Sequence, residues 1–162
     1  MSFSDMDRLE ANYTKSSVIG IANDHHGVLI KKEIINKLNQ AGYDIEDYGT
    51  NDSEMVDYPV YAFKIGEAIN SKEIDFGILL CNSGIGMSIA CNKVKGVRCA
   101  KVSSLWDAEM TRRDNDANVI ALSTKLDVNE LVEIIIKFLT TEFLNIERYQ
   151  RRIELIDNYQ ND

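Results

Sequence analysis

Residues 76–92 constrain the fold more than any other part of the sequence. Five apolar residues stand almost without interruption over 76–81, which is typical of a strand buried on both faces of a parallel sheet. A serine and two glycines follow at once and predict a tight turn. Beyond the turn, Met87, Ile89 and Ala90 fit the inner side of a short helix. The stretch therefore predicts a strand, a glycine-containing loop and a helix in direct succession.

The rest of the chain alternates short apolar runs with amphipathic stretches. The expected strands cover residues 18–22, 43–48, 76–81, 97–102 and 119–122. The expected helices cover residues 30–41, 59–69, 87–94, 104–114, 128–139 and about 146–159. Such alternation predicts an α/β fold with a parallel sheet covered by helices on both faces. We expect one domain over residues 17–162, preceded by a tail or accessory helix at residues 1–16.

Two of these helices carry further local signals. The first should end at Gly42, with Lys31 among the charged residues on its outer face. The second has the only proline, Pro59, where the first turn of a helix tolerates it, and Asp57 is a candidate capping residue.

Charge and cysteine content exclude several functional classes for this chain of 162 residues. A net charge of -8 disfavours nucleic acid or an anionic membrane as the main partner, because both select clustered positive charge. The three cysteines are an odd number without metal-site spacing, which favours a reducing, cytoplasmic environment. No apolar run approaches the roughly 18 residues of a membrane span. Cys91 and Cys99 are assigned to the core.

Cys81 is the first candidate for chemistry, because a thiol between a strand end and a helix N-terminus ionises more easily than a free thiol. The alternative is a buried, inert cysteine. Asp24 and His25 follow the first strand, and parallel strands end at one edge of a sheet, so these residues and Cys81 should share a crevice. The neighbouring His26 is expected to point elsewhere. The alternative for Asp24 and His25 is a strand-end cap beside a surface histidine.

Two arginines on the last helix form a second candidate site. Arg148 and Arg152 are four residues apart and project from one face, where they can clamp a phosphate. The alternative is a solvated face on which they neighbour Glu147 and Glu154.

Taken together, these motifs resemble the sugar-phosphate isomerase family that contains ribose-5-phosphate isomerase type B and the galactose-6-phosphate isomerase subunits. The matching segments are residues 24–27, 48–50, 57–59, 81–86, 92–93, 96–98, 115–118 and 148–152. The resemblance implies a three-layer α/β/α sandwich on a five-stranded parallel sheet, Rossmann-like, with a C-terminal helical extension. It also implies a homodimer with shared active sites, leaves a tetramer open, and implies no metal or organic cofactor.

The resemblance also implies a role for each matching residue in proton transfer. Cys81 is the base that moves a proton from C2 of the open-chain aldose to C1, and Asp24 moves a hydroxyl proton between O1 and O2. Ser83 and the backbone amides of the loop stabilise the enediolate. These loop residues are Asn82, Gly84, Ile85 and Gly86. Preorganised donors of this kind are what a developing enediolate requires.

Substrate binding is implied for a further set of residues. His25, Arg148 and Arg152 hold the phosphate, with Lys125 at a position where relatives often have arginine. Asn115 binds a sugar hydroxyl. The implied substrate is a sugar phosphate, with ribose 5-phosphate and ribulose 5-phosphate as the favoured pair.

The sequence departs from the family pattern at two positions. Asp114 stands where relatives of the ribose type have a histidine that helps to open the furanose ring, and whether Asp114 or His26 takes that role stays open. Asn82 replaces a usual glycine, which asparagine tolerates better than most residues. A six-carbon substrate such as galactose 6-phosphate or allose 6-phosphate is therefore the second hypothesis. A non-catalytic module that binds a phosphorylated ligand is the third.

Overall fold

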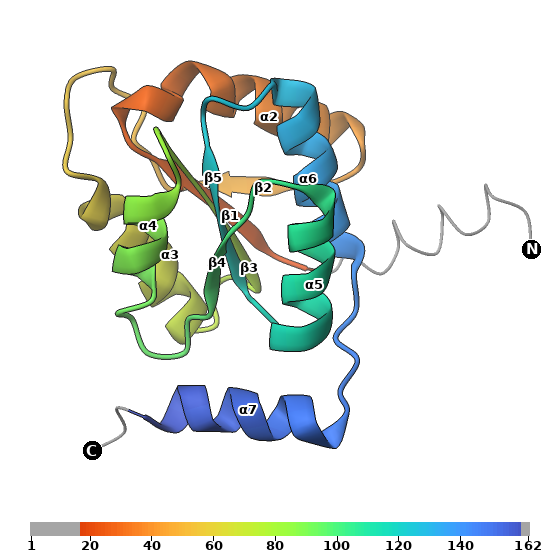
Figure 1. Cartoon of the computed structure of the whole chain (residues 1–162). Coiled ribbons are helices and arrows are strands. Elements are labelled where there is room, and N and C mark those ends of the chain that lie inside the picture. Colours follow the sequence, from red (N-terminus) through yellow and green to blue (C-terminus); the bar gives the residue numbers. More distant parts are fainter. Residues whose placement is uncertain (1–16, 160–162) are drawn as a thin grey trace, which may run out of the picture.

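The computed structural model describes residues 17–159 (Figure 1). Its strands are β1 (Ile19–Asn23), β2 (Ile45–Asp47), β3 (Phe76–Cys81), β4 (Cys99–Lys101) and β5 (Val119–Ser123). Its helices are η1 (His25–Gly27), α2 (Val28–Gln40), α3 (Tyr58–Asn70), α4 (Ile85–Cys91), α5 (Leu105–Asn115), α6 (Val128–Thr140) and α7 (Glu147–Asn158). The tail or accessory helix expected over residues 1–16 lies outside the described residues.

The five strands form one parallel sheet in the order β2-β1-β3-β5-β4. The chain runs from β1 outward to β2 and then returns to place β3 on the other side of β1, so the direction of winding reverses between β1 and β3. Every residue of β1 is buried, as is every residue of β3 except the first. The parallel sheet predicted from the apolar runs is confirmed.

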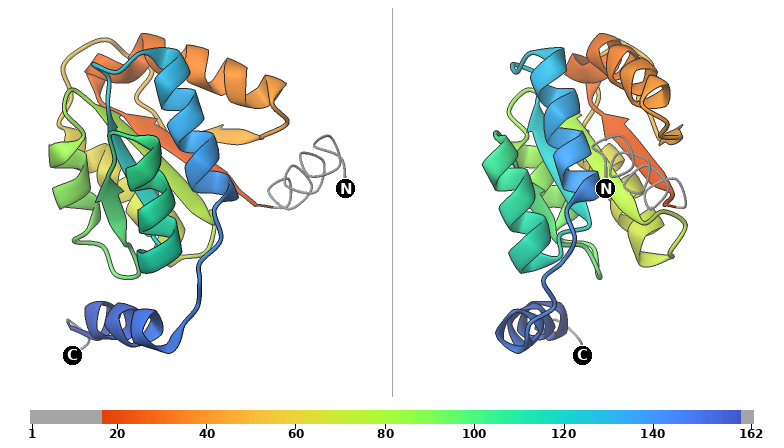
Figure 2. Two further views of the ribbon diagram at one scale, coloured as in Figure 1. Left: turned by 45° about the vertical axis from the view of Figure 1, so that its right-hand side comes forward. Right: turned by 90° about the vertical axis from the view of Figure 1, so that its right-hand side faces the viewer.

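Helices cover both faces of this sheet (Figure 2). On one face, α3 and α4 pack against each other and contribute residues such as Ile65 and Met87 to a core cluster. On the other face, α2, α5 and α6 pack together and bury residues such as Leu38, Ala108 and Phe138. The fold is therefore the predicted three-layer α/β/α sandwich.

The ends of several elements differ from the sequence prediction. The edge strands β2 and β4 have three residues each instead of six, because only the residues that pair with β1 or β5 join the ladder. Gly42 follows α2 with a φ of 97°, as expected of a terminating glycine. Asp57 occupies the N-cap position of α3, as predicted, but its side chain makes no capping hydrogen bond.

Two apolar residues lie differently from their predicted places. Ile89 is 61% exposed, because Met87, Ala90 and Cys91 form the inner side of the seven-residue helix α4 and position 89 faces outward. Cys91 is fully buried as expected, but Cys99 begins an edge strand and is only half-buried.

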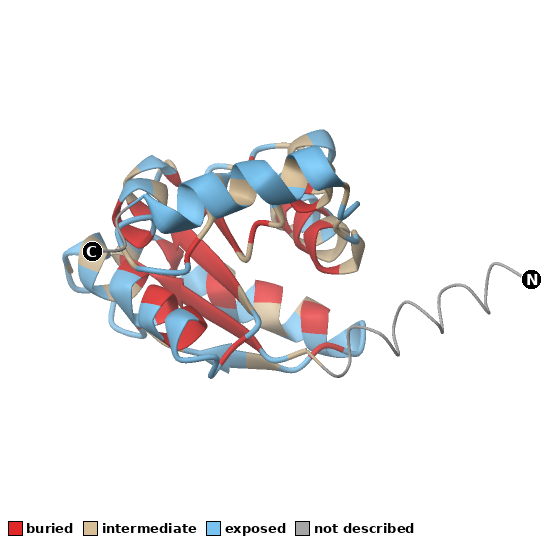
Figure 3. Cartoon of the chain, turned by 90° about the horizontal axis from the view of Figure 1, so that it is seen from below, coloured by how far each residue is buried: buried red, intermediate tan, exposed pale blue. Residues whose placement is uncertain are grey.

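Helix α7 is set apart from the three layers, and residues 141–146 connect it to α6 (Figures 1 and 2). Viewed from its side of the molecule, α7 is exposed along its length, and none of its described residues is buried (Figure 3). Its Asp157 forms an ion pair with Arg98, which precedes β4. No helix in the described part of the chain is long and apolar enough to cross a membrane.

Candidate active site

Asp24 and Cys81 lie side by side at the edge of the sheet where the strands end, called here the C-terminal edge. The register pairs Asn23 with Leu80, the last residues before them, and the Asp24 N–H donates to the Leu80 carbonyl at 3.1 Å. This is also where the winding reverses, which is the usual position of ligand sites in open α/β sheets. The sequence-based expectation that Asp24 and Cys81 approach each other agrees with this register.

The loop after β3 folds back onto the Cys81 thiol. The Cys81 side chain is buried, and its Sγ accepts the Gly84 N–H at 3.1 Å. Gly84 has a left-handed φ of 76°, and an added Cβ would lie 3.0 Å from the Leu122 carbonyl carbon, so glycine is needed here. Ser83 Oγ accepts the Ile85 N–H at 3.2 Å. The Gly84 N–H is thus aimed at the sulfur, the atom through which a reactive cysteine acts.

The end of β5 brings Lys125 to the same edge. Cys81 pairs with Ser123 across the sheet, and Ser123 Oγ donates to the Asn82 carbonyl at 2.7 Å. The same Oγ accepts the Lys125 N–H at 3.1 Å, and the Lys125 side chain is exposed. A cation is thus available beside the loop for an anionic ligand.

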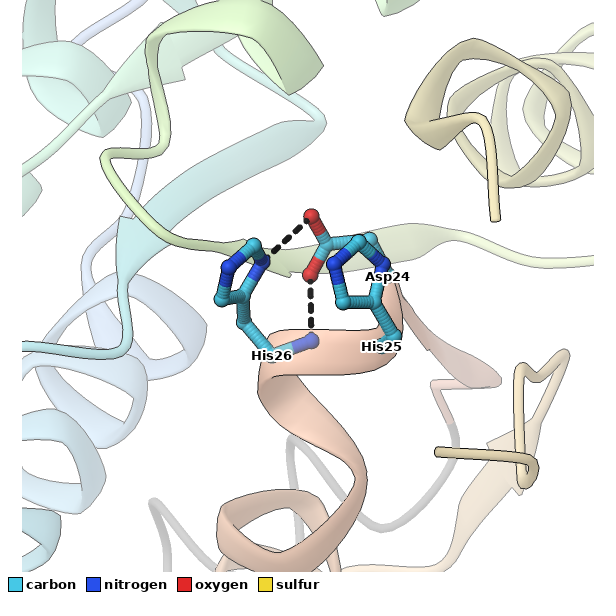
Figure 4. A group of neighbouring side chains, drawn as sticks. All are labelled: Asp24, His25 and His26. Carbon is cyan, nitrogen blue, oxygen red and sulfur yellow. Dashed lines mark hydrogen bonds and ion pairs between the residues drawn. The ribbon is translucent and has the colours of Figure 1, made fainter. Parts of the chain in front are cut away.

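Asp24 and the two histidines form one cluster (Figure 4). Asp24 Oδ1 accepts the His26 backbone N–H at 2.9 Å, and Oδ2 lies 3.1 Å from His26 Nδ1. The prediction that His26 points elsewhere is therefore wrong, because the short helix η1 turns its ring back onto Asp24. His25 Nδ1 accepts the Val56 N–H at 3.2 Å, which leaves its Nε2 to carry the proton of the neutral ring.

These three side chains are also close enough to be considered as metal ligands, since one ligand atom from each lies within 4.8 Å of the others. Two of the ring nitrogens are already engaged, however: His25 Nδ1 accepts an N–H, and His26 Nδ1 faces the carboxylate. A carboxylate bonded to an imidazole is an arrangement suited to proton transfer.

A buried lysine fixes the backbone next to this cluster. Lys31 is fully buried, and its Nζ donates to Asp47 Oδ1 at 2.8 Å and to the Thr50 carbonyl at 2.7 Å. The chain at Gly49 and Thr50 in turn hydrogen-bonds both backbone groups of Asn23. The outward position predicted for Lys31 is wrong. Lys31 lies three residues from both Val28 and Ile34, so its helical spacing places it on the buried face of α2. Only its charge had indicated an outward position.

Replacing Lys31 by methionine should lower the free energy of unfolding by about 2 kcal/mol, because two charge-assisted hydrogen bonds are lost. Urea denaturation measures this change. Lys32→Met is the matched control, since Lys32 is exposed, and it should stay within about 0.5 kcal/mol of wild type. Equal stability of the two variants would show that the buried lysine contributes nothing.

Four of the predicted site residues lie at the opposite, N-terminal edge of the sheet. Asp114 and Asn115 end α5, which runs back from the C-terminal edge, and Arg148 and Arg152 lie on α7. The Asp114 carboxylate accepts from Arg113 Nε at 2.9 Å and raises the pKa of the Arg113 guanidinium. Within one chain, these residues are not brought together with Cys81.

Arg98 connects α5 and α7, the two helices that carry these four residues. Its guanidinium donates to the carbonyl of Asn115 at 3.1 Å, to the carbonyl of Asp116 at 2.9 Å, and to the carboxylate of Asp157 on α7. A cavity of about 720 Å³ lies here, lined by Asn92, Lys93, Arg98, Asn115 and Asp157 among others. The chain therefore carries two groups of polar residues on opposite edges of its sheet.

Comparison with known proteins places this geometry in a family. The model of the family described as Ribose/Galactose Isomerase matches residues 19–156. Ribose-5-phosphate isomerase B of Escherichia coli is 37% identical over 138 residues, which cover 85% of this chain and 93% of that protein.

Solved structures are similar over almost the same length. A ribose 5-phosphate isomerase from Thermotoga maritima superimposes with a TM-score of 0.85 at 40% identity, covering 88% of this chain and 99% of the other. Ribose-5-phosphate isomerase B of Mycoplasma genitalium, solved with bound ribulose-5-phosphate, gives a TM-score of 0.84 at 37% identity and covers 91% of this chain and 98% of the other. From the match along the whole described fold, we conclude that the chain belongs to the ribose/galactose isomerase family of enzymes.

Proposed function

We propose that the protein interconverts ribose 5-phosphate and ribulose 5-phosphate by proton transfer through an enediolate. The observation that carries this proposal is the presence of a buried thiol and a buried carboxylate, Cys81 and Asp24, at the C-terminal ends of adjacent strands. Aldose–ketose isomerisation needs one group for a carbon-bound proton and one for a hydroxyl proton.

In the proposed reaction, the Cys81 thiolate removes the proton from C2 of the open-chain aldose and returns it to C1. Asp24 transfers the hydroxyl proton between O1 and O2. Negative charge develops on the carbonyl oxygen as the C2 proton leaves, and the backbone N–H groups of Asn82, Ser83 and Gly86 are the donors assigned to it, because those of Gly84 and Ile85 donate to Cys81 Sγ and Ser83 Oγ. His25 presents an Nε2–H, and Lys125 a cation, to the phosphate at the same edge.

A second copy of the chain is assigned to complete each site. Asn115, Arg148 and Arg152 lie at the N-terminal edge, so they reach a substrate at Cys81 only from a partner subunit. Helix α7 is amphipathic, yet it buries no described residue within its own chain, and the face with Leu155 and Ile156 is open, since these side chains are 68% and 58% exposed. Docking of α7 onto a partner would cover this face and bring the two arginines to the partner's phosphate site.

The second candidate substrate is a six-carbon sugar phosphate such as galactose 6-phosphate or allose 6-phosphate. It is favoured by one observation: Asp114, at the position where ribose-type relatives have histidine, is held in an ion pair with Arg113.

Deuterium incorporation from deuterated water tests both candidates. An isomerase that uses a single base should place deuterium at C1 of ribulose 5-phosphate as it forms, and NMR measures this across a panel of sugar phosphates. Faster turnover of a hexose phosphate would transfer the assignment to the second candidate. Absence of exchange with every aldose phosphate would contradict both, and would favour a non-catalytic protein that binds a phosphorylated ligand.

A further inference from the structure

Ring opening is a chemical step to which the proposed reaction assigns no residue. The C2 proton of an aldose is acidic only when C1 is a carbonyl, whereas ribose 5-phosphate is closed as a furanose through O4. We propose that His26, held in place by Asp24, opens this ring. The proposal rests on the proposed function and adds one catalytic residue to it.

The hydrogen bonds around His26 determine which of its nitrogens can act as a base. An ionised carboxylate only accepts hydrogen bonds, so the 3.1 Å contact with Asp24 Oδ2 places the ring proton of neutral His26 on Nδ1. Nε2 then carries a free lone pair. The His26 side chain is 45% exposed, whereas that of Asp24 is 7% exposed, so the imidazole is the accessible member of the pair.

The same two residues also fix the direction of the ring. Asp24 accepts the backbone N–H of His26 through Oδ1 and the ring N–H through Oδ2, so one carboxylate holds both ends of the histidine. Figure 4 shows the ring of His26 directed at the carboxylate across the short turn of η1. Because Asp24 is assigned to O1 and O2 of the substrate, its partner His26 lies next to the anomeric centre.

The other groups with suitable chemistry are engaged or distant. His25 Nδ1 accepts the Val56 N–H, so its neutral ring offers only a donor at Nε2. Asp114 would reach the site from the partner subunit together with Asn115, but its carboxylate is paired with Arg113, and Lys125 carries an ammonium without a lone pair. Among the described residues of the C-terminal edge, His26 is the neutral imidazole whose lone pair is not engaged.

The step moves one proton and breaks one bond. His26 Nε2 takes the proton of the anomeric hydroxyl, the C1–O1 bond becomes a carbonyl, and the bond between C1 and O4 breaks. O4 then receives the proton from the imidazolium. Both oxygens are attached to C1, so one nitrogen can serve both of them. No oxidation state changes, and the histidine returns to its starting form.

A His26→Gln variant separates ring opening from isomerisation, because glutamine can still donate to Asp24 but cannot serve as a base. Ribulose 5-phosphate is acyclic, since its 5-hydroxyl is phosphorylated, so exchange of its C1 proton with deuterated water needs no ring opening. We expect turnover of ribose 5-phosphate to fall roughly 100-fold while this exchange stays within about threefold of wild type. His25→Gln is the matched control and should lower both rates together, because His25 is assigned to ligand binding.

A second variant tests the base directly. Added imidazole should restore ribose 5-phosphate turnover in His26→Ala in proportion to its concentration, without changing the exchange of ribulose 5-phosphate. Equal losses in both assays for His26→Gln, or undiminished turnover of ribose 5-phosphate, would overturn the role of His26. A wild-type protein without either activity would instead overturn the proposed function.

Discussion

Replacing Cys81 by alanine is expected to lower kcat by roughly three orders of magnitude or more, because no other thiol lies at the C-terminal edge of the sheet among the described residues. The phosphate contacts are left intact, so the variant should still bind sugar phosphates. Steady-state kinetics with ribose 5-phosphate measures the loss, and calorimetric titration with the same ligand measures the binding.

The matched control is Cys99→Ala. Cys99 is a half-buried cysteine on the edge strand β4, and it begins that strand at the opposite edge from Cys81. Its replacement should change kcat little. Wild-type-like turnover in Cys81→Ala would falsify the assignment of the base, and loss of binding together with turnover would point to a structural role for the thiol.

The sequence was sufficient to predict the fold because its apolar runs, its helical periodicity and its turn residues indicate the same elements. The run over residues 76–81 is apolar on both faces, as only a strand covered by two helical layers needs to be. Each expected strand and helix between residues 18 and 159 is present. The errors lie at edge strands and on the outer side of α4, where few tertiary contacts fix the ends and the periodicity is short.

The C-terminal edge of the sheet was also predictable, since parallel strands bring their final residues together. Cys81 ends one predicted strand and Asp24 follows another, and the register places both at the same edge of the sheet. Tertiary arrangement was not predictable in the same way. His26 turns back onto Asp24 because of the three-residue helix η1. Lys31 is buried because it finds acceptors at Asp47 and Thr50, which are distant from it in sequence.

The local sequence also gave no indication that the remaining site residues lie far from Cys81. Asn115 and the arginines of α7 read as parts of one site in the sequence, whereas α5 and α7 place them at the edge opposite Cys81. Within one chain, the arginines of α7 could reach the phosphate site only if α7 moved to the C-terminal edge of the sheet. The ion pair between Arg98 and Asp157 holds α7 at the N-terminal edge instead. Assembly is the simpler way to unite the two groups.

Mixing two inactive variants should therefore restore activity. Cys81→Ala removes the base from one group, and the double variant Arg148→Ala/Arg152→Ala removes the phosphate contacts from the other. In a heterodimer of these chains, one of the two sites combines an intact Cys81 with intact arginines from its partner. With random pairing of equal amounts, about half of the dimers are mixed, so activity should recover to about a quarter of wild type.

The control for this experiment pairs Cys81→Ala with Asp24→Asn. Both substitutions fall in the group at the C-terminal edge, so every site in such a heterodimer lacks either the thiol or the carboxylate. No recovery is expected from that mixture. Kinetics after joint refolding, with sedimentation to verify that dimers have formed, measures both mixtures. Recovery in neither mixture despite dimer formation would show that each chain builds its phosphate site alone, and recovery in both would show that Cys81 and Asp24 act in different sites.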